Sequence, residues 1–146
     1  METQILDLLT KERVCVLALP LTGGSPHAAT MHYSFVEEPL TFYFQTSNDT
    51  EKVKAIGPET VKAAVVVGFS ELDWLTLQMR GTIRTVIDPM DLEAVYKIHY
   101  AKQPQAEQYK GLHSVFLKFT PTWWRFTDFT TEPETIISNQ DDLTRV

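Results

Sequence analysis

Side chains that could hold a phosphate group gather between positions 46 and 52. Thr46, Ser47 and Thr50 bring hydroxyls, and Lys52 brings an ammonium, within a few residues of each other. A short helix that opens with Asp49 or Thr50 as its cap would add free backbone N–H groups at the same place. Together these donors would bind a phosphate. The same residues also fit an ordinary strand, turn and capped helix with a solvated lysine, so both interpretations stay open.

The elements on either side of this turn are marked by their apolar spacing. Leu40, Phe42 and Phe44 alternate along the chain, which places them on one face of a strand. Val53 and Ile56 follow at helical spacing. The polar turn therefore connects a predicted strand to a predicted helix, and these two elements position its side chains.

The sequence lacks the motifs of common catalytic and nucleotide-binding sites. Gly23-Gly24 stands alone in a predicted hairpin turn, without a Rossmann or Walker fingerprint. Cys15 lies in an apolar run and is predicted to be buried rather than nucleophilic. No serine sits in a nucleophile elbow, and the histidines are too dispersed for a metal site. They are His27, His32, His99 and His113. The pattern favours a protein whose reactive atoms belong to a bound cofactor.

Length and charge limit the classes of protein to consider. The chain has 146 residues, 43% of them apolar, which predicts one domain over residues 1–146. Its net charge of -6 argues against nucleic acid and acidic membranes as partners, because both require a basic patch. No basic leader precedes an apolar segment, and no apolar stretch approaches the roughly 18 residues of a membrane helix. We therefore expect a cytoplasmic protein.

The predicted elements describe a mainly β fold. Helices are expected at 3–13, 50–57 and 88–102, with a short helical piece after Pro104. Six strands are expected at 14–21, 27–36, 40–46, 61–69, 75–86 and 114–129, joined mostly by short turns. Such a series predicts an antiparallel barrel with helices at its ends and edges, a core over about residues 12–128, and a loose polar tail at 130–146.

Two of these strands are predicted to carry a polar outer face. In 27–36, Thr30, His32 and Ser34 alternate with apolar residues. In 75–86, Gln78 and Arg80 belong to a polar series that alternates with apolar residues, and the nearby glycine marks a bend or close approach. Hydroxyls and arginine on such a face indicate a cofactor or partner surface.

Taken together, these segments resemble the flavin-binding split-barrel family that includes pyridoxamine 5′-phosphate oxidase, over roughly residues 12–128. The family's phosphate run is matched by Phe44-Gln45-Thr46, then Thr50-Glu51-Lys52, then Ile56. Gln78, Arg80 and Gly81 resemble the strand that contacts the flavin ring. Trp123-Trp124-Arg125 resembles a segment that the second subunit contributes, and alternation lets only one of the two tryptophans reach the flavin. A short branch of the family is the nearest match.

The resemblance implies a six-stranded antiparallel split β-barrel with flanking short helices, which forms a homodimer and binds flavin mononucleotide (FMN). It implies an oxidoreductase that passes a hydride or electrons between a small-molecule donor and a small acceptor. Two alternatives stay open: a flavin- or haem-binding storage or sensor module, and a structural dimer without cofactor. The implied cofactor-binding residues are Thr30, His32, Tyr33, Ser34, Thr46, Ser47, Thr50, Lys52, Gln78, Arg80, Trp123 and Arg125.

The chain also departs from the family pattern in two places. Glu51 stands where the oxidases carry an arginine in the phosphate triplet, and Thr30 stands where they begin the second strand with arginine. Each arginine would contribute a charge-assisted hydrogen bond to an anion. We therefore expect weaker FMN binding. No residues match the arginines that bind a substrate phosphate, and the catalytic residues stay unidentified.

Overall fold

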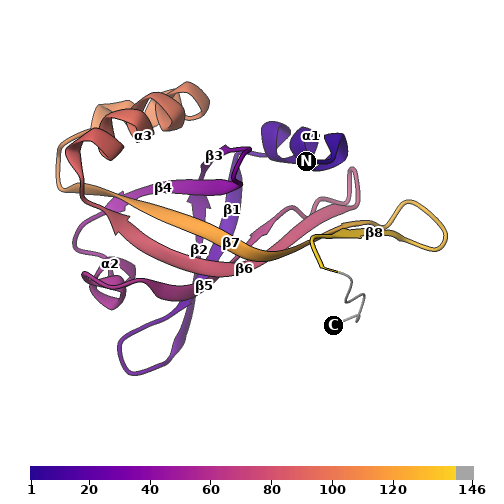
Figure 1. Cartoon of the computed structure of the whole chain (residues 1–146), viewed down its shortest axis with the longest axis horizontal. Coiled ribbons are helices and arrows are strands. Elements are labelled where there is room, and N and C mark those ends of the chain that lie inside the picture. The colour runs from indigo at the N-terminus through magenta and orange to yellow at the C-terminus, as the bar shows by residue number, and fades with distance from the viewer. Residues whose placement is uncertain (141–146) are drawn as a thin grey trace.

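The computed structural model describes residues 1–140, which form an antiparallel sheet with helices around it (Figure 1). The strands are β1 (Val14–Pro20), β2 (Pro26–His32), β3 (Ser34–Val36), β4 (Thr41–Ser47), β5 (Val61–Val67), β6 (Leu75–Val86), β7 (Ser114–Asp128) and β8 (Thr135–Ser138). The helices are α1 (Thr3–Lys11), α2 (Glu51–Ile56), α3 (Pro89–Lys102) and the 3₁₀ helix η1 (Pro104–Tyr109). The strand order is β2-β1-β5-β6-β7-β4-β3, and β8 pairs with β7.

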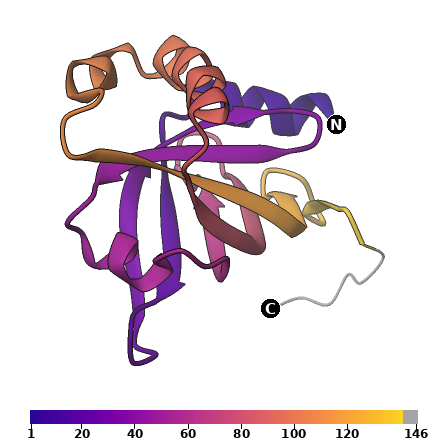
Figure 2. The same ribbon diagram turned by 60° about the vertical axis from the view of Figure 1, so that its left-hand side comes forward.

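The sheet curls on itself without closing. Figure 2 shows β1 and β2 crossing β4 near its end, and β2 contacts β4, so the two edges of the sheet come together. Within residues 1–140 no ladder of paired residues joins β2 to β4. We call the place where β2 meets β3 and β4 the seam. A curled antiparallel sheet with an open seam is a split barrel, and the predicted fold is thus confirmed.

The interior of the barrel is filled by alternate strand residues and by one helix. Leu77, Met79 and Ile83 of β6 are buried, while Gln78 and Arg80 between them are exposed, as the alternation predicted. On the first helix, α1, the side chains of Ile5, Leu8 and Leu9 are each at most 1% exposed. They join the same core cluster, so α1 covers one end of the barrel as expected.

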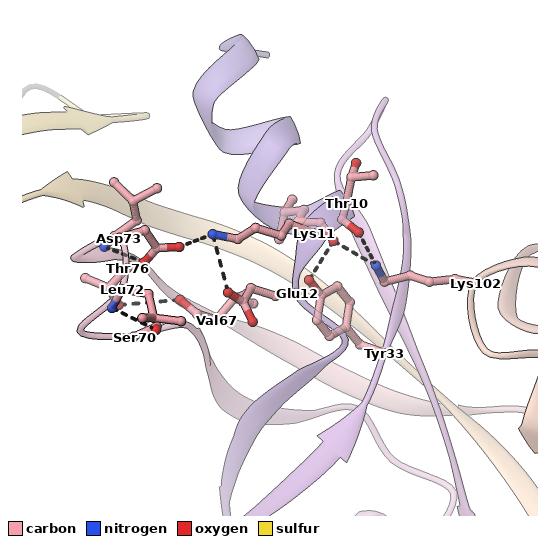
Figure 3. Close-up of polar contacts among 12 residues, drawn as sticks. Thr10, Lys11, Glu12, Tyr33, Val67, Ser70, Leu72, Asp73, Thr76 and Lys102 are labelled. Atoms are coloured by element: carbon pink, nitrogen blue, oxygen red, sulfur yellow. Dashed lines mark hydrogen bonds and ion pairs between the residues drawn. The ribbon is translucent and has the colours of Figure 1, made fainter.

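Side chains from distant elements satisfy the C-terminal carbonyls of α1 (Figure 3). The Lys102 ammonium donates to the carbonyl oxygens of Leu9 at 2.9 Å and Thr10 at 3.1 Å. The Tyr33 hydroxyl donates to the Leu9 oxygen at 2.7 Å. These oxygens have no partner inside the helix, so their capture fixes α1 against the barrel. Lys11 is paired with Asp73 in the β5–β6 loop.

Helix α3 begins where the sequence predicted. The Asp88 carboxylate accepts from the backbone N–H groups of Met90 at 2.8 Å and Asp91 at 3.3 Å, and Pro89 takes the first helical position. The helix packs against β3 and β4. It is the longest helix between residues 1 and 140, and none in that part of the chain is long and apolar enough to cross a membrane.

The predicted second strand, 27–36, is divided in two at Tyr33. β2 pairs with β1 and β3 pairs with β4, so the chain passes from one edge of the sheet to the other at this residue. The Gln103 side-chain amide, which is 0% exposed, donates to the carbonyl oxygens of Arg13 at 2.9 Å and Tyr33 at 3.1 Å. The Arg13 guanidinium donates to the Gln103 oxygen at 2.7 Å. Because the chain changes its pairing partner from β1 to β4 at this residue, the predicted single strand forms two strands.

The tail also differs from the expectation. Part of the segment predicted to be loose forms β8, which pairs with the end of β7. Ile136 and Ile137 are half-buried there, and Ile137 packs against the core cluster. With β8 and the divided second strand, residues 1–140 contain eight strands rather than six. The rest of the predicted tail, 141–146, lies outside the described residues.

Gly81 lies at a close approach of two strands, as the sequence predicted. The pairing of β6 with β7 shifts register between Arg80 and Gly81. A Cβ atom at this position would collide with the carbonyl oxygen of Thr120 and lie 2.7 Å from the Pro121 Cα atom. Both obstacles are backbone, so a side chain here would force the strands apart.

We expect Gly81→Ala to lower the free energy of unfolding by about 3 kcal/mol, the upper part of the range for overpacking. Gly24→Ala is the control, because nothing lies within 4 Å of its Cβ position and only its positive φ opposes a side chain. We expect the control to cost about 1 kcal/mol. Urea denaturation of both variants checks this, and equal losses would contradict the close approach.

Candidate functional site

A cavity of about 590 Å³ lies over the seam. Strand β2, the end of β4, helix α3, η1 and the segment leading into β7 all contribute to its wall. The lining residues are Thr30, Met31, His32, Gln45, Thr46, Ser47, His99, Gln105, Ala106, Tyr109, Leu112, His113 and Ser114. Its size is that of a pocket for a small molecule or cofactor. None of these thirteen side chains is an aspartate, glutamate, lysine or arginine.

Four of the predicted site residues line this cavity together. Thr30 and His32 are exposed on β2, because they alternate with Met31, whose side chain joins the core. Thr46 and Ser47 come from the last two positions of β4. The seam brings the two strands together even though fourteen or more residues of chain separate these pairs. Within residues 1–140 no cluster of His, Cys, Asp and Glu side chains could hold a metal ion.

Ser34 lies under α3 rather than on an open outer face. It does point away from the barrel core, but the helix covers it, and its side chain is 1% exposed. Its hydroxyl is 2.8 Å from Nδ1 of His99, which is also 1% exposed and lines the cavity. The rings of Phe116 and Tyr100 meet the imidazole edge-on. The expected polar face of the second strand is thus partly buried by tertiary packing.

His99 is held neutral by its surroundings. Burial, with a smaller contribution from nearby His32, lowers the pKa of His99 from 6.5 to about 4. Sequence reasoning missed this residue, since a single histidine on a helix carries no motif. Gln45 of β4 also lines the cavity without having been predicted, and so do Tyr109 and His113, because η1 and the following loop reach it only through the fold.

Lys52 is buried, whereas the interpretation as an ordinary capped helix would leave it solvated. Its side chain is 8% exposed, and among residues 1–140 it makes no hydrogen bond or ion pair. Lys54, in the same helix, is exposed. The helix cap is Thr50 rather than Asp49. The Thr50 hydroxyl accepts from the Val53 N–H at 3.4 Å and donates to a backbone oxygen of β4, so it is engaged in the turn.

A second group of predicted residues forms a cluster on β6 and β7. The Arg125 guanidinium donates to the Gln78 oxygen at 3.4 Å. The Trp123 ring is close to two guanidinium groups, with Arg80 4.1 Å and Arg125 5.6 Å from its centre. Trp124 points the other way and packs against the core, as alternation predicted. Gln78, Arg80, Trp123 and Arg125 thus share one face of the sheet.

This cluster and the seam cavity lie at opposite ends of one row of residues. The row consists of residues that are paired on neighbouring strands, in the order Thr30, Val16, Val66, Gln78 and Arg125. Four strand spacings separate the ends, roughly 19 Å along the curved sheet. We call this side of the sheet the outer face. One chain therefore does not bring the two groups of predicted residues together.

Tyr33 is placed apart from both groups. Its side chain is 0% exposed and its hydroxyl is bonded to the end of α1. Burial raises the pKa of this hydroxyl far above its ordinary value. Only the backbone of Tyr33 lies near the seam, so its side chain belongs to the core.

The fold and its cavity define the class of protein as a split β-barrel with a small-molecule pocket at the seam. The sequence pattern of the family described as pyridoxamine 5′-phosphate oxidase matches residues 1–122. The chain belongs to this family. No curated protein sequence matches the chain.

Several solved structures share the fold of this chain at low sequence identity. A pyridoxamine 5′-phosphate oxidase-related, FMN-binding protein from Nostoc punctiforme is 17% identical, with a TM-score of 0.69 over 97% of this chain and 91% of its own. A general stress protein 26-related protein from Clostridium acetobutylicum is 15% identical, with a TM-score of 0.71 over 95% and 93%. A haem-binding protein from Mycobacterium smegmatis is 14% identical, with a TM-score of 0.73 over 96% and 59%.

The burial of His99 predicts a pH dependence of stability. The unfolded chain takes up this proton near pH 6.5, the folded chain only near pH 4. The contribution to the free energy of unfolding is therefore complete above pH 6.5 and is lost as the pH falls toward 4, up to about 3 kcal/mol. Denaturation at pH 7 and pH 4.5 should show a smaller fall for His99→Gln than for the wild type. Equal falls would mean that His99 is not buried as a neutral group.

Proposed function

We propose that the chain binds FMN, with the phosphate at Lys52 and the ring in the seam cavity. The observation that carries this proposal is the burial of Lys52 without a partner among residues 1–140. Packing holds the stem of this side chain while its ammonium stays unpaired, so the cation is positioned for an anionic group. Thr46 and Ser47, which line the cavity at the end of β4, precede Lys52 by six and five residues in the chain.

The residues present fit this cofactor in charge as well as in size. A phosphate requires a cation, and the proposal gives it Lys52. The flavin ring is flat and uncharged, and the cavity wall is made of hydroxyl, amide, imidazole and apolar side chains without a charge. Glu51 is exposed beside Lys52 and weakens the field for an anion. We therefore propose that FMN is bound less tightly than a site with arginine there would bind it.

We further propose that two chains complete the site as a homodimer. The outer face carries Val14 and Val16, which are 39% and 41% exposed. Its second row is made of small residues, Ala28, Ala18 and Ala64, before it reaches Arg80 and Trp123. A smooth apolar sheet face allows a second sheet to pack closely.

A twofold dimer would also unite the two groups of predicted residues. In a twofold interface the same contacts occur twice, so one end of a row can meet the opposite end of the same row in the other chain. The partner subunit's Arg125 would then lie over Thr30, with Gln78 and Trp123 beside it. The separation of these groups within one chain is what a two-subunit site requires.

The proposed activity is oxidoreduction. When bound, FMN supplies a ring that accepts and releases a hydride or electrons. His32 lies on the open side of the cavity, where a small donor or acceptor could approach. The fold places no paired carboxylates in the cavity wall, so binding and orientation are the contributions we assign to the chain.

Haem is the second candidate ligand. Three imidazoles, from His32, His99 and His113, line the cavity, and imidazole is a common ligand of haem iron. The absorption spectrum of the purified protein with added FMN or haemin separates the two, because the bands of a bound flavin and a bound haem differ. A spectrum that neither compound changes would favour a structural dimer without cofactor.

The FMN proposal predicts a selective effect of one lysine. Lys52→Met should weaken FMN binding by about 1.5 to 3 kcal/mol, the size of a hydrogen bond to a charged group. Lys54→Met is the matched control, since it removes an exposed ammonium from the same helix and should leave binding unchanged. Flavin fluorescence titration measures both. Equal affinities for Lys52→Met and the wild type would place the phosphate elsewhere.

The dimer proposal predicts that a charge on the outer face separates the subunits. Val16→Lys puts an ammonium at the centre of the face, where burial against a second chain is unfavourable. Leu72→Lys is the control, because Leu72 is 97% exposed in the β5–β6 loop. Sedimentation should give dimers for the wild type and control and monomers for Val16→Lys. A monomeric wild type would contradict the two-subunit site.

A further inference from the structure

His99 presents one imidazole nitrogen to its surroundings without a partner. Nδ1 is occupied by the Ser34 hydroxyl at 2.8 Å. No hydrogen bond to Nε2 is formed within residues 1–140, although the residue is 1% exposed and lines the cavity. Because Nδ1 is occupied and the residue lines the cavity, Nε2 is the ring nitrogen that is available to hydrogen-bond a ligand atom.

The cavity wall indicates what kind of ligand part could meet this nitrogen. Its thirteen lining residues carry no formal charge, and they include flat or apolar surfaces from Tyr109, Leu112 and Met31. A phosphate or carboxylate in contact with this wall would lack a cation. A neutral, flat heterocycle with hydrogen-bonding atoms at its edge would match the wall on both counts.

We propose that His99 is a ligand-binding residue whose Nε2 hydrogen-bonds the edge of a neutral heterocyclic ring, the flavin ring, in the seam cavity. This inference rests on the proposed binding of FMN and adds the residue that orients the ring. Lys52 and His99 then bind opposite ends of the ligand. The anionic end is held at α2, and the uncharged end is held under α3.

Ser34 is the positioning residue for this contact. Its hydroxyl can donate to Nδ1 or accept from it, and the choice fixes whether Nε2 donates or accepts. The ring cannot turn freely, because Phe116 lies edge-on at 5.1 Å and Tyr100 at 5.9 Å. The lowered pKa of His99 keeps the imidazole neutral at neutral pH, which suits an uncharged ligand.

Two flavins separate the contributions of His99 and Lys52. Riboflavin is FMN without its phosphate, so both compounds present the same ring. We expect His99→Phe to weaken riboflavin and FMN by the same factor, roughly three- to tenfold, the loss of one neutral hydrogen bond. Lys52→Met should weaken FMN alone. His99→Gln, which keeps a hydrogen-bonding side chain, should recover part of the affinity for both flavins, and Ser34→Ala should resemble His99→Phe in direction.

A measurement on the wild-type protein tests the contact of His99 with the ring even if the variants do not fold. In a protein labelled with ¹⁵N at histidine, His99 is identified as the ring that stays neutral down to a pH of about 4. Added riboflavin should shift its Nε2 resonance. A merely structural His99 would leave that resonance unchanged.

The outcomes distinguish this inference from the proposal on which it rests. Failure of the wild type to bind either flavin would overturn both. FMN binding that depends on Lys52 but is unaffected by the His99 variants, together with an unchanged Nε2 resonance, would overturn only the role of His99. An effect of His99→Phe on FMN without an equal effect on riboflavin would also overturn it, because the contact would then not be with the ring.

Discussion

The hydrogen bonds of Gln103 at the seam determine much of the structure. Where the chain leaves β2 for β3, the backbone at Tyr33 changes partners, and buried carbonyl oxygens there need donors from elsewhere. The Gln103 amide donates to the oxygens of Arg13 and Tyr33. His99 lies four residues earlier, one turn back on α3, so the anchor that satisfies the seam also sets the height of His99 above Ser34.

Charged side chains and the uncharged cavity wall lie in different parts of the molecule. The residues that line the seam cavity carry no formal charge, while Arg80 and Arg125 lie at the far end of the outer face. Both arginines are stabilised by contact with the Trp123 ring. The arginines therefore put no charge into the cavity wall of their own chain.

Local pattern was sufficient for some features and insufficient for others. Alternation in 75–86 predicted the buried set of Leu77 and Met79, and the close approach at Gly81, because both depend on neighbouring residues. The division of the second strand and the cover over Ser34 depend on contacts with β4 and α3, distant in sequence. The burial of Lys52 also depends on such contacts, because only tertiary packing buries its stem. His99 had no local signal at all.

Thr30 stands where the family carries an arginine, and this difference leaves the cavity wall without a formal charge. Thr30 lies in the cavity wall, next to His32 and facing the end of β4. The family resemblance places an arginine at this position, and its guanidinium would put a permanent charge among the lining residues. With threonine there, the wall is neutral, and Lys52 becomes the buried cation of the site. A neutral wall opposes an anionic substrate as well as favouring a neutral ring, because a second phosphate would find no partner in it. A wall without formal charge therefore suits the uncharged ring of the proposed ligand, whose phosphate is assigned to Lys52.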